Sequence, residues 1–226
     1  MIRKTFEHEL QEVKDEILVL GSMVEQAVLD SMESLKKRDL KASKKIYEQD
    51  RVINERRFAI ENHCMILIAT QQPMARDLRL LASMLDVASE MERMGDYAKG
   101  IATINIRMGD TPLLKPLIDL PRMAAIAVSM LHRALTAFMN EDVETARAIP
   151  AEDDEVDALY DQIYRELMTF VIADPKTIER ANYLLWAAHN LERLADRVTN
   201  ICERTVFVVT GEIKEIPTSS RLLDPK

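Results

Sequence analysis

The chain repeats one phrase at a fixed interval of 100 residues. The first copy reads ASEMERMGDYAKGIA over residues 88–102, and the second reads AHNLERLADRVTNIC over residues 188–202. A fixed internal offset is the signature of a duplicated structural unit, so the fold must be built from two similar halves. Each copy places a glutamate and an aspartate four residues apart, which puts both carboxylates on one face if the segment is helical. The duplication therefore predicts one carboxylate pair in each half.

The apolar residues follow a helical period through most of the chain. With only five glycines and 5% aromatic residues, the composition favours helices over strands. Spacings of three and four residues predict six helices, at about 6–35, 39–70, 74–108, 123–139, 143–172 and 175–209. Asp174 and Pro175 form a typical helix start. Helices of about 30 residues would be about 45 Å long, which suits bundles with short loops.

We therefore predict an all-α fold of two tandem three-helix bundles related by internal duplication. Gly109, Pro112, Pro116 and Pro121 form the densest group of helix breakers, and they separate the halves. The predicted domains are residues 1–110 and residues 111–212. Residues 213–226, which include Pro217, are expected to form a flexible C-terminal tail.

Composition also limits the cellular context and the partners. No apolar run reaches the roughly 18 residues that a membrane-spanning helix needs, and the charged N-terminus does not resemble a signal peptide. Cys64 and Cys202 lie in apolar helical stretches without metal-ligand spacing, which predicts free buried thiols and a reducing compartment. A net charge of −8 argues against nucleic-acid binding. A cytoplasmic location is expected.

The duplicated acids are candidate metal ligands because they interrupt or flank apolar stripes. Burying like charges without a counter-ion is costly, so something cationic must offset them. The second predicted helix of each half adds further oxygen donors at corresponding positions. The predicted ligands are Asp50, Glu92 and Asp96 in the first half, with Asn54 nearby, and Asp153, Asp157, Glu192 and Asp196 in the second. All-oxygen sites suit magnesium, manganese, calcium or iron, and no Glu-x-x-His motif of ferritin-like di-iron proteins occurs.

A salt-bridge lattice is the competing interpretation of the same acids. It would pair Arg93 with Asp96 and Arg193 with Asp196, leaving the glutamates solvated. Among the histidines, His189 shares a helix face with Glu192 and is a possible outer ligand. His63 and His132 are expected in the core. No glycine-rich phosphate loop and no nucleophile with a base at catalytic spacing is evident, so a binding or regulatory role fits better than catalysis.

The two phrases, with the Asp-x-x-Ile-Asn segment 50–54 and the Asp-x-x-Val-Asp segment 153–157, resemble the repeated signature of the PhoU family. Members of this family are phosphate-specific transport system accessory proteins, and the resemblance covers nearly the whole chain. It implies a cytoplasmic, non-enzymatic protein of two three-helix bundles. Its acidic motifs would bind metal ions or clusters of iron, manganese or magnesium through the seven carboxylates named above. Three residues depart from the family's pattern. Asn54 stands where the second half has Asp157, so the first site would carry less negative charge and hold metal less tightly. Ala195 and Arg197 replace residues often seen around the second aspartate, which would narrow the close approach there or place a cation beside the second site.

The resemblance also implies a function and partners. The expected role is negative regulation of the phosphate-starvation (Pho) regulon, by coupling the Pst phosphate importer, through its ATPase PstB, to the sensor kinase PhoR. A homodimer and a peripheral association with the membrane through these partners are expected. An accessory factor of a low-affinity phosphate transporter is the alternative, and a metal-dependent hydrolase is a more distant third.

Overall fold

The computed structural model describes residues 2–217, with side chains from Thr5 onward, and every regular element in that range is a helix. The elements are α1 (Ile2–Lys37), α2 (Leu40–Gln71), α3 (Arg76–Met108), α4 (Asp119–Asn140), α5 (Val143–Ala148), the 3-10 turn η1 (Ile149–Glu152), α6 (Asp153–Ala173), the 3-10 turn η2 (Pro175–Thr177) and α7 (Ile178–Thr210). The predicted all-α class is confirmed.

Local sequence signals explain several helix ends. The side chain of Asp39 accepts hydrogen bonds from the backbone N–H groups of Lys41 and Ala42, each at 3.0 Å, and so caps the start of α2. Asp142 caps α5 in the second half in the same way, at 3.1 Å from the Thr145 nitrogen. Gly211 ends α7 in the left-handed conformation, with φ of 78°, which glycine adopts without a steric penalty.

One predicted helix is wrong in its continuity. The expected helix 143–172 is divided into α5, η1 and α6, because Pro150 has no N–H to donate and its ring disturbs the preceding turn. The expected helix 175–209 also begins with a 3-10 turn, over which Asp174 accepts from the Lys176 nitrogen at 3.1 Å. By contrast, Pro121 lies in the first turn of α4, where a backbone N–H would have no partner within the helix. Proline therefore costs no hydrogen bond at this position.

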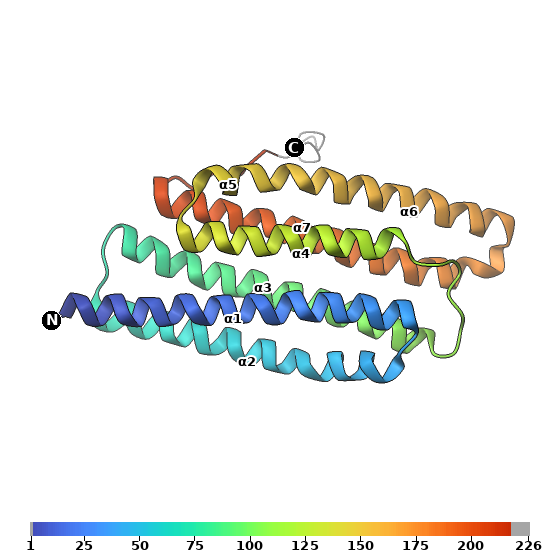
Figure 1. Ribbon diagram of the computed structural model, residues 1–226, viewed down its shortest axis with the longest axis horizontal. Coiled ribbons are helices and arrows are strands. Elements are labelled where there is room, and N and C mark those ends of the chain that lie inside the picture. Colours follow the sequence, from blue (N-terminus) through green and yellow to red (C-terminus); the bar gives the residue numbers. More distant parts are fainter. Residues whose placement is uncertain (1, 218–226) are drawn as a thin grey trace.

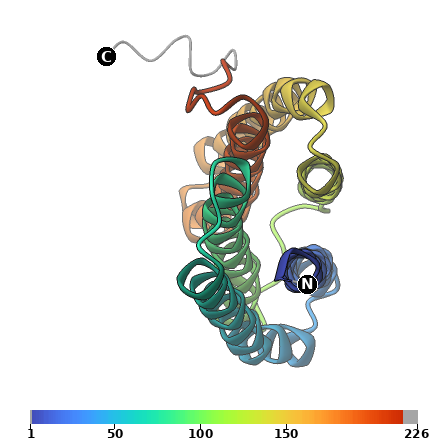
Figure 2. The same cartoon turned by 90° about the vertical axis from the view of Figure 1, so that its left-hand side faces the viewer.

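The helices pack in two layers around a shared core. Seen end-on, α2, α3, α7 and α6 form a curved row, and α1 and α4 lie together on one side of it (Figure 2). The halves meet where α3 contacts α7 and where α1 contacts α4. One cluster of buried apolar residues, from Phe6 to Val208, runs through both halves. The division at residues 110 and 111 stays a prediction.

The central helices α3 and α7 run antiparallel (Figure 1). Gly100 of α3 lies against Asn190 of α7, and Arg197, later in α7, reaches back to Glu90. A Cβ atom at Gly100 would come within 3.0 Å of the Asn190 amide nitrogen, so glycine allows this close approach. The two repeated segments, residues 88–102 of α3 and residues 188–202 of α7, therefore contact each other.

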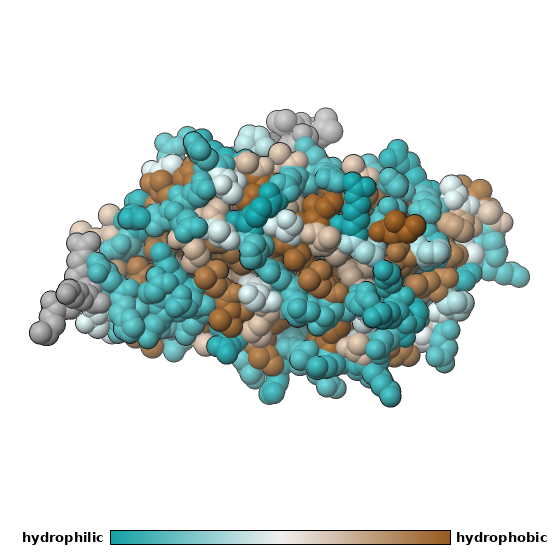
Figure 3. Space-filling model, viewed as in Figure 1, coloured by the Kyte–Doolittle hydropathy of each residue, from teal (hydrophilic) through white to brown (hydrophobic). Residues whose placement is uncertain are grey.

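Figure 3 shows a largely hydrophilic face with small separate apolar patches. No helix among residues 2–217 combines the length and apolarity required to cross a bilayer. Residues 218–226 of the predicted tail lie outside the described residues. Ahead of them, the Ile216 nitrogen donates to Glu203 at 3.1 Å, which holds this segment beside α7.

The histidine positions correct one expectation. His132 was expected in the core, but its side chain is 71% exposed and its Nδ1 lies 3.2 Å from Glu25. His63 is only half-buried, 3.2 Å from Glu16. Both histidines lie at the edge of their helix's apolar stripe, and each meets a glutamate of α1 from there.

Both cysteines are free and fully buried, as predicted. Burial raises the pKa of the Cys64 thiol and that of the Cys202 thiol to about 12. Since only the thiolate is reactive, we expect neither thiol to react with a maleimide in the native protein at pH 8, and both to react in denaturant. Counting labelled thiols by mass spectrometry tests this. Rapid labelling of either cysteine in the native protein would contradict the packing around it.

Candidate functional site

In the first half, α2 and α3 bring a lysine into the predicted carboxylate cluster. Asp50 has a side chain only 6% exposed, and its Oδ2 lies 2.7 Å from the Lys99 Nζ. The same ammonium lies 3.5 Å from Asp96 Oδ1. The Asn54 amide also donates to Asp50 Oδ2, at 3.2 Å. Asp50 and Asp96 therefore converge as the sequence predicts, but they converge on the ammonium group of Lys99.

Glu92 lies one helical turn before Asp96, and two arginines, Arg57 and Arg93, act on its carboxylate. Burial, followed by the negative charge of Asp96, raises the pKa of Glu92, while Arg57 and Arg93 act in the opposite direction. Arg93 pairs with Glu90, at 3.7 Å, and Asp96 pairs with Lys99. The alternative lattice, in which Arg93 pairs with Asp96, is therefore wrong in the first half.

The second half places its acids at the corresponding positions of α6 and α7. Asp153 is 2% exposed at the first residue of α6. Burial, then the negative charges of Asp196 and Asp157, raises the pKa of Glu192 to about 7. Among the described residues, no ion pair joins Arg193 to Asp196. Glu192 therefore feels the negative charges of Asp196 and Asp157 in a poorly hydrated setting, and Arg193 offsets only part of this effect.

His189 contacts this second cluster. Its Nδ1 lies 3.2 Å from Glu192 Oε2, as the spacing of three residues predicts. The His189 ring also lies beside Tyr160 of α6, with 6.3 Å between the ring centroids. The histidine therefore sits at the rim of the cluster, where it can hydrogen-bond a carboxylate.

The fit to metal ions differs between the halves. Within residues 2–217, in the side-chain arrangement that the structure shows, no three His, Cys, Asp or Glu residues are close enough together to hold a metal ion. In the second half the donors are nevertheless all carboxylates, which suit a hard cation, and their mutual repulsion is what such a cation would relieve. In the first half, two protein donors already occupy Asp50 Oδ2. The seven predicted ligands stay predictions.

A groove that the sequence does not predict lies between α3 and α7. It has a volume of about 400 Å³, and its lining includes Asp96 and Lys99 of the first cluster and His189, which contacts Glu192 of the second. Arg107 and Trp186 complete its walls. No periodicity signals such a groove, since it depends on how the two repeated helices cross.

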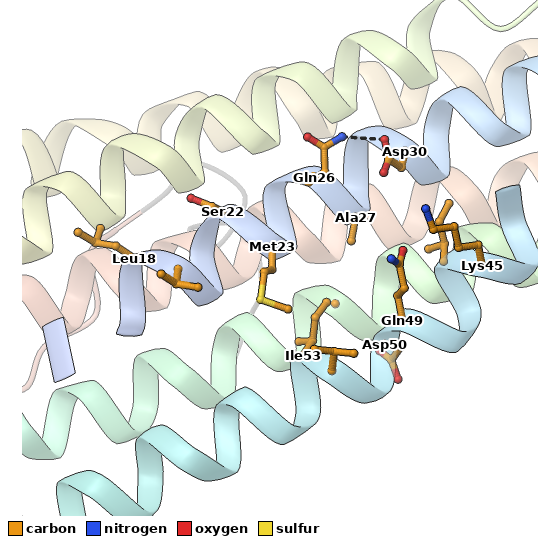
Figure 4. A pocket seen from close by; sticks show the side chains of 14 residues that line it. Leu18, Ser22, Met23, Gln26, Ala27, Asp30, Lys45, Gln49, Asp50 and Ile53 are labelled. Atoms are coloured by element: carbon orange, nitrogen blue, oxygen red, sulfur yellow. Dashed lines mark hydrogen bonds between the residues drawn. The ribbon is translucent and has the colours of Figure 1, made fainter. Parts of the chain in front are cut away.

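A second, more apolar groove of about 600 Å³ lies between α1 and α2 (Figure 4). Met23 of α1 and Ile53 of α2 line it, and the hydrogen bond from Gln26 to Asp30, at 2.7 Å, lies along α1. Gly95 of α3 forms part of the floor. The sequence signal for this groove is a pair of apolar residues, Leu18 and Val19, outside the apolar stripe of α1. Both are exposed in the structure.

Comparison with known proteins decides the family. The PhoU domain matches this chain twice, over residues 17–104 and 120–205. The chain belongs to the PhoU family. The two matches correspond to the two halves of the duplication, so the resemblance noted in the sequence and the predicted repeat are both confirmed.

Full-length relatives extend this assignment. A phosphate-specific transport system accessory protein PhoU homolog of Clostridium acetobutylicum is 34% identical over 213 residues, covering 94% of this chain and 97% of the relative. PhoU of Escherichia coli is 33% identical over 207 residues, covering 92% of this chain and 86% of the relative. The crystal structure of the phosphate transport system regulatory protein PhoU from Streptococcus pneumoniae is 32% identical with a TM-score of 0.85, covering 92% of this chain and 99% of that one. The PhoU fold is therefore present at nearly full length.

Proposed function

We propose that this PhoU-family protein is a negative regulator of the phosphate-starvation regulon. In this proposal it couples the Pst importer, through its ATPase PstB, to the sensor kinase PhoR at the cytoplasmic side of the membrane. The observation that carries the proposal is the match of both halves to the PhoU domain, together with relatives of nearly equal length that are named accessory or regulatory proteins of phosphate transport.

The architecture supports a role in binding rather than in catalysis. Long helices present an extended, mostly polar face (Figure 3), which suits docking to partner proteins. In the absence of a membrane-crossing helix in residues 2–217, a position at the membrane would depend on partners. A homodimer would double these faces, and we include it in the proposal.

Metal ions have a structural part in this proposal. Asp153, Asp157, Glu192 and Asp196 would hold a hard cation, for which iron, manganese and magnesium are the candidates. When bound, the cation supplies positive charge that offsets the repulsion among these acids. Because the acids come from both α6 and α7, a shared cation would tie these two helices together, so the outer surface of the second half would stiffen.

Reporter assays in phosphate-replete cells test the regulatory role. We expect deletion of the gene to raise alkaline phosphatase, or an equivalent regulon reporter, by at least about tenfold, and the wild-type protein to restore repression. Glu92→Ala/Glu192→Ala should fail to restore it if the acids matter for signalling. The exposed acids Glu48 and Glu144 offer a matched control, since Glu48→Ala/Glu144→Ala leaves both clusters intact.

Each outcome separates one hypothesis from another. Repression by both double variants would keep the regulator and remove the acids from its mechanism. An unchanged reporter in the deletion strain would contradict the proposal. In that case, altered phosphate uptake in the same strain would favour the alternative, an accessory factor of a low-affinity phosphate transporter.

A further inference from the structure

The two halves differ at two positions of the repeat, and in the first half the residues at both positions contact the buried Asp50. Lys99 in the first half corresponds to Thr199 in the second, at the 100-residue offset of the repeated phrase. Asn54 corresponds to Asp157, at the 103-residue offset that relates Asp50 to Asp153. The first exchange removes one positive charge and the second adds one negative charge. At these two positions the second half is therefore more negative by two charges.

Lys99 is held in the cluster by several interactions. Its ammonium lies 2.7 Å from Asp50 and 3.5 Å from Asp96, and 5.4 Å from the centre of the Tyr47 ring, within the range of a cation–π contact. Its side chain is 31% exposed, against 6% for Asp50. Lysine is an ammonium ion at neutral pH, so these contacts place a full positive charge beside Asp50 and Asp96.

Thr199 has a different role. Its hydroxyl donates to the backbone oxygen of Asp196, at 2.7 Å, within its own helix. In the first half, burial raises the pKa of Glu92 and the charge of Arg57 opposes this rise. The residue that corresponds to Arg57 in the second half, at the 103-residue offset, is the neutral Tyr160. Arg57 also pairs with Glu61, 2.9 Å away, whereas Lys99 contacts Asp50 and Asp96 directly.

We propose that Lys99 is the resident cation of the first half, so that the metal requirement of this protein is confined to the second half. The inference rests on the metal part of the proposed function, but it changes the number of sites. The ammonium occupies the space between Asp50 and Asp96 that a metal ion would need, and Asp50 Oδ2 already accepts two hydrogen bonds. A divalent ion brought there would also meet the repulsion of the ammonium.

Manganese binding to paired variants tests the confinement. Purified full-length protein, stripped of metal with a chelator, is titrated with Mn²⁺ alone by calorimetry and by equilibrium dialysis. Glu92→Gln/Asp96→Asn should leave affinity and bound Mn²⁺ within about twofold of wild type. The equivalent pair Glu192→Gln/Asp196→Asn should weaken binding at least about tenfold. Equal losses in both variants would overturn the proposal.

A gain of binding provides the reverse test. Asn54→Asp/Lys99→Thr gives the first half the side chains of the second, and we expect bound Mn²⁺ per chain to increase about twofold. Adding Glu92→Gln/Asp96→Asn to that variant should abolish the increase. Circular dichroism verifies folding. No increase in a folded variant would argue that something other than Lys99 excludes metal from the first half.

A measurement without metal keeps this inference separate from the proposed function. With chelator present, Lys99→Met should lower the unfolding midpoint because Asp50 loses its ammonium partner, whereas Lys44→Met, at an exposed position of α2, should not. An unchanged midpoint in Lys99→Met would overturn the role of Lys99. If wild type binds no Mn²⁺, the metal part of the proposed function fails, and the Lys99→Met result still decides whether Lys99 neutralises the first cluster.

Discussion

Glu192→Gln should stabilise the metal-free protein at pH 8 by on the order of 2 kcal/mol. Burial and the charges of Asp196 and Asp157 raise the pKa of Glu192 from 4.5 to about 7, so ionising this carboxyl opposes folding. The sign follows from proton binding. The folded protein holds the Glu192 proton more tightly than the unfolded chain, so this group's contribution to stability is present below pH 4.5 and is lost as pH rises through 7.

Glutamine carries no charge at any pH, so the advantage of Glu192→Gln should be full above pH 7 and should vanish near pH 4.5. Urea unfolding in chelator at several pH values measures it. Glu92→Gln is the matched control in the first half, where Arg57 and Arg93 offset part of the repulsion, and its gain should be smaller. A destabilised Glu192→Gln at pH 8 would mean that the carboxylate makes favourable contacts that outweigh its repulsion.

Asn105→Ala should lower the free energy of unfolding by about 3 kcal/mol, and the melting temperature by roughly 6–12 °C. Asn105 is completely buried near the end of α3. Its amide donates to the Ser34 backbone oxygen at 3.0 Å and to Ser43 Oγ at 2.8 Å, and its Oδ1 accepts from Arg38. The substitution would therefore leave a small cavity and several buried polar groups with fewer partners.

The exposed Asn62 of α2 provides the control, since Asn62→Ala should change the melting temperature by less than about 2 °C. Differential scanning calorimetry of both variants makes the comparison. Because Arg38 also donates to the Gly109 backbone oxygen, at 2.7 Å, loss of Asn105 should loosen the link between the α1–α2 turn and the end of α3. Equal melting temperatures for the two variants would show that water replaces the lost hydrogen bonds without a net penalty.

The sequence by itself determined the class, the duplication and the family. These properties depend on local chemistry and on spacing along the chain. Apolar residues at helical intervals can bury only one face, and Asp39, Asp142 and Asp174 are caps whose side chains reach the next backbone N–H groups. The position of Glu192 four residues before Asp196 likewise predicts their repulsion without a tertiary structure. Pro150 itself is a helix breaker that can be seen in the sequence, although the apolar spacing of residues 143–172 favours one continuous helix.

Only the tertiary structure decided which charges meet between helices. Asp50 and Lys99 lie 49 residues apart, and their contact depends on the rotation of α2 against α3, which the whole core determines. The same holds for the antiparallel contact between α3 and α7, where Arg197 reaches Glu90. Spacing shows which residues share a face of one helix, but not which face of another helix will be opposite. For that reason the sequence indicated two equivalent acidic clusters, and packing made them different.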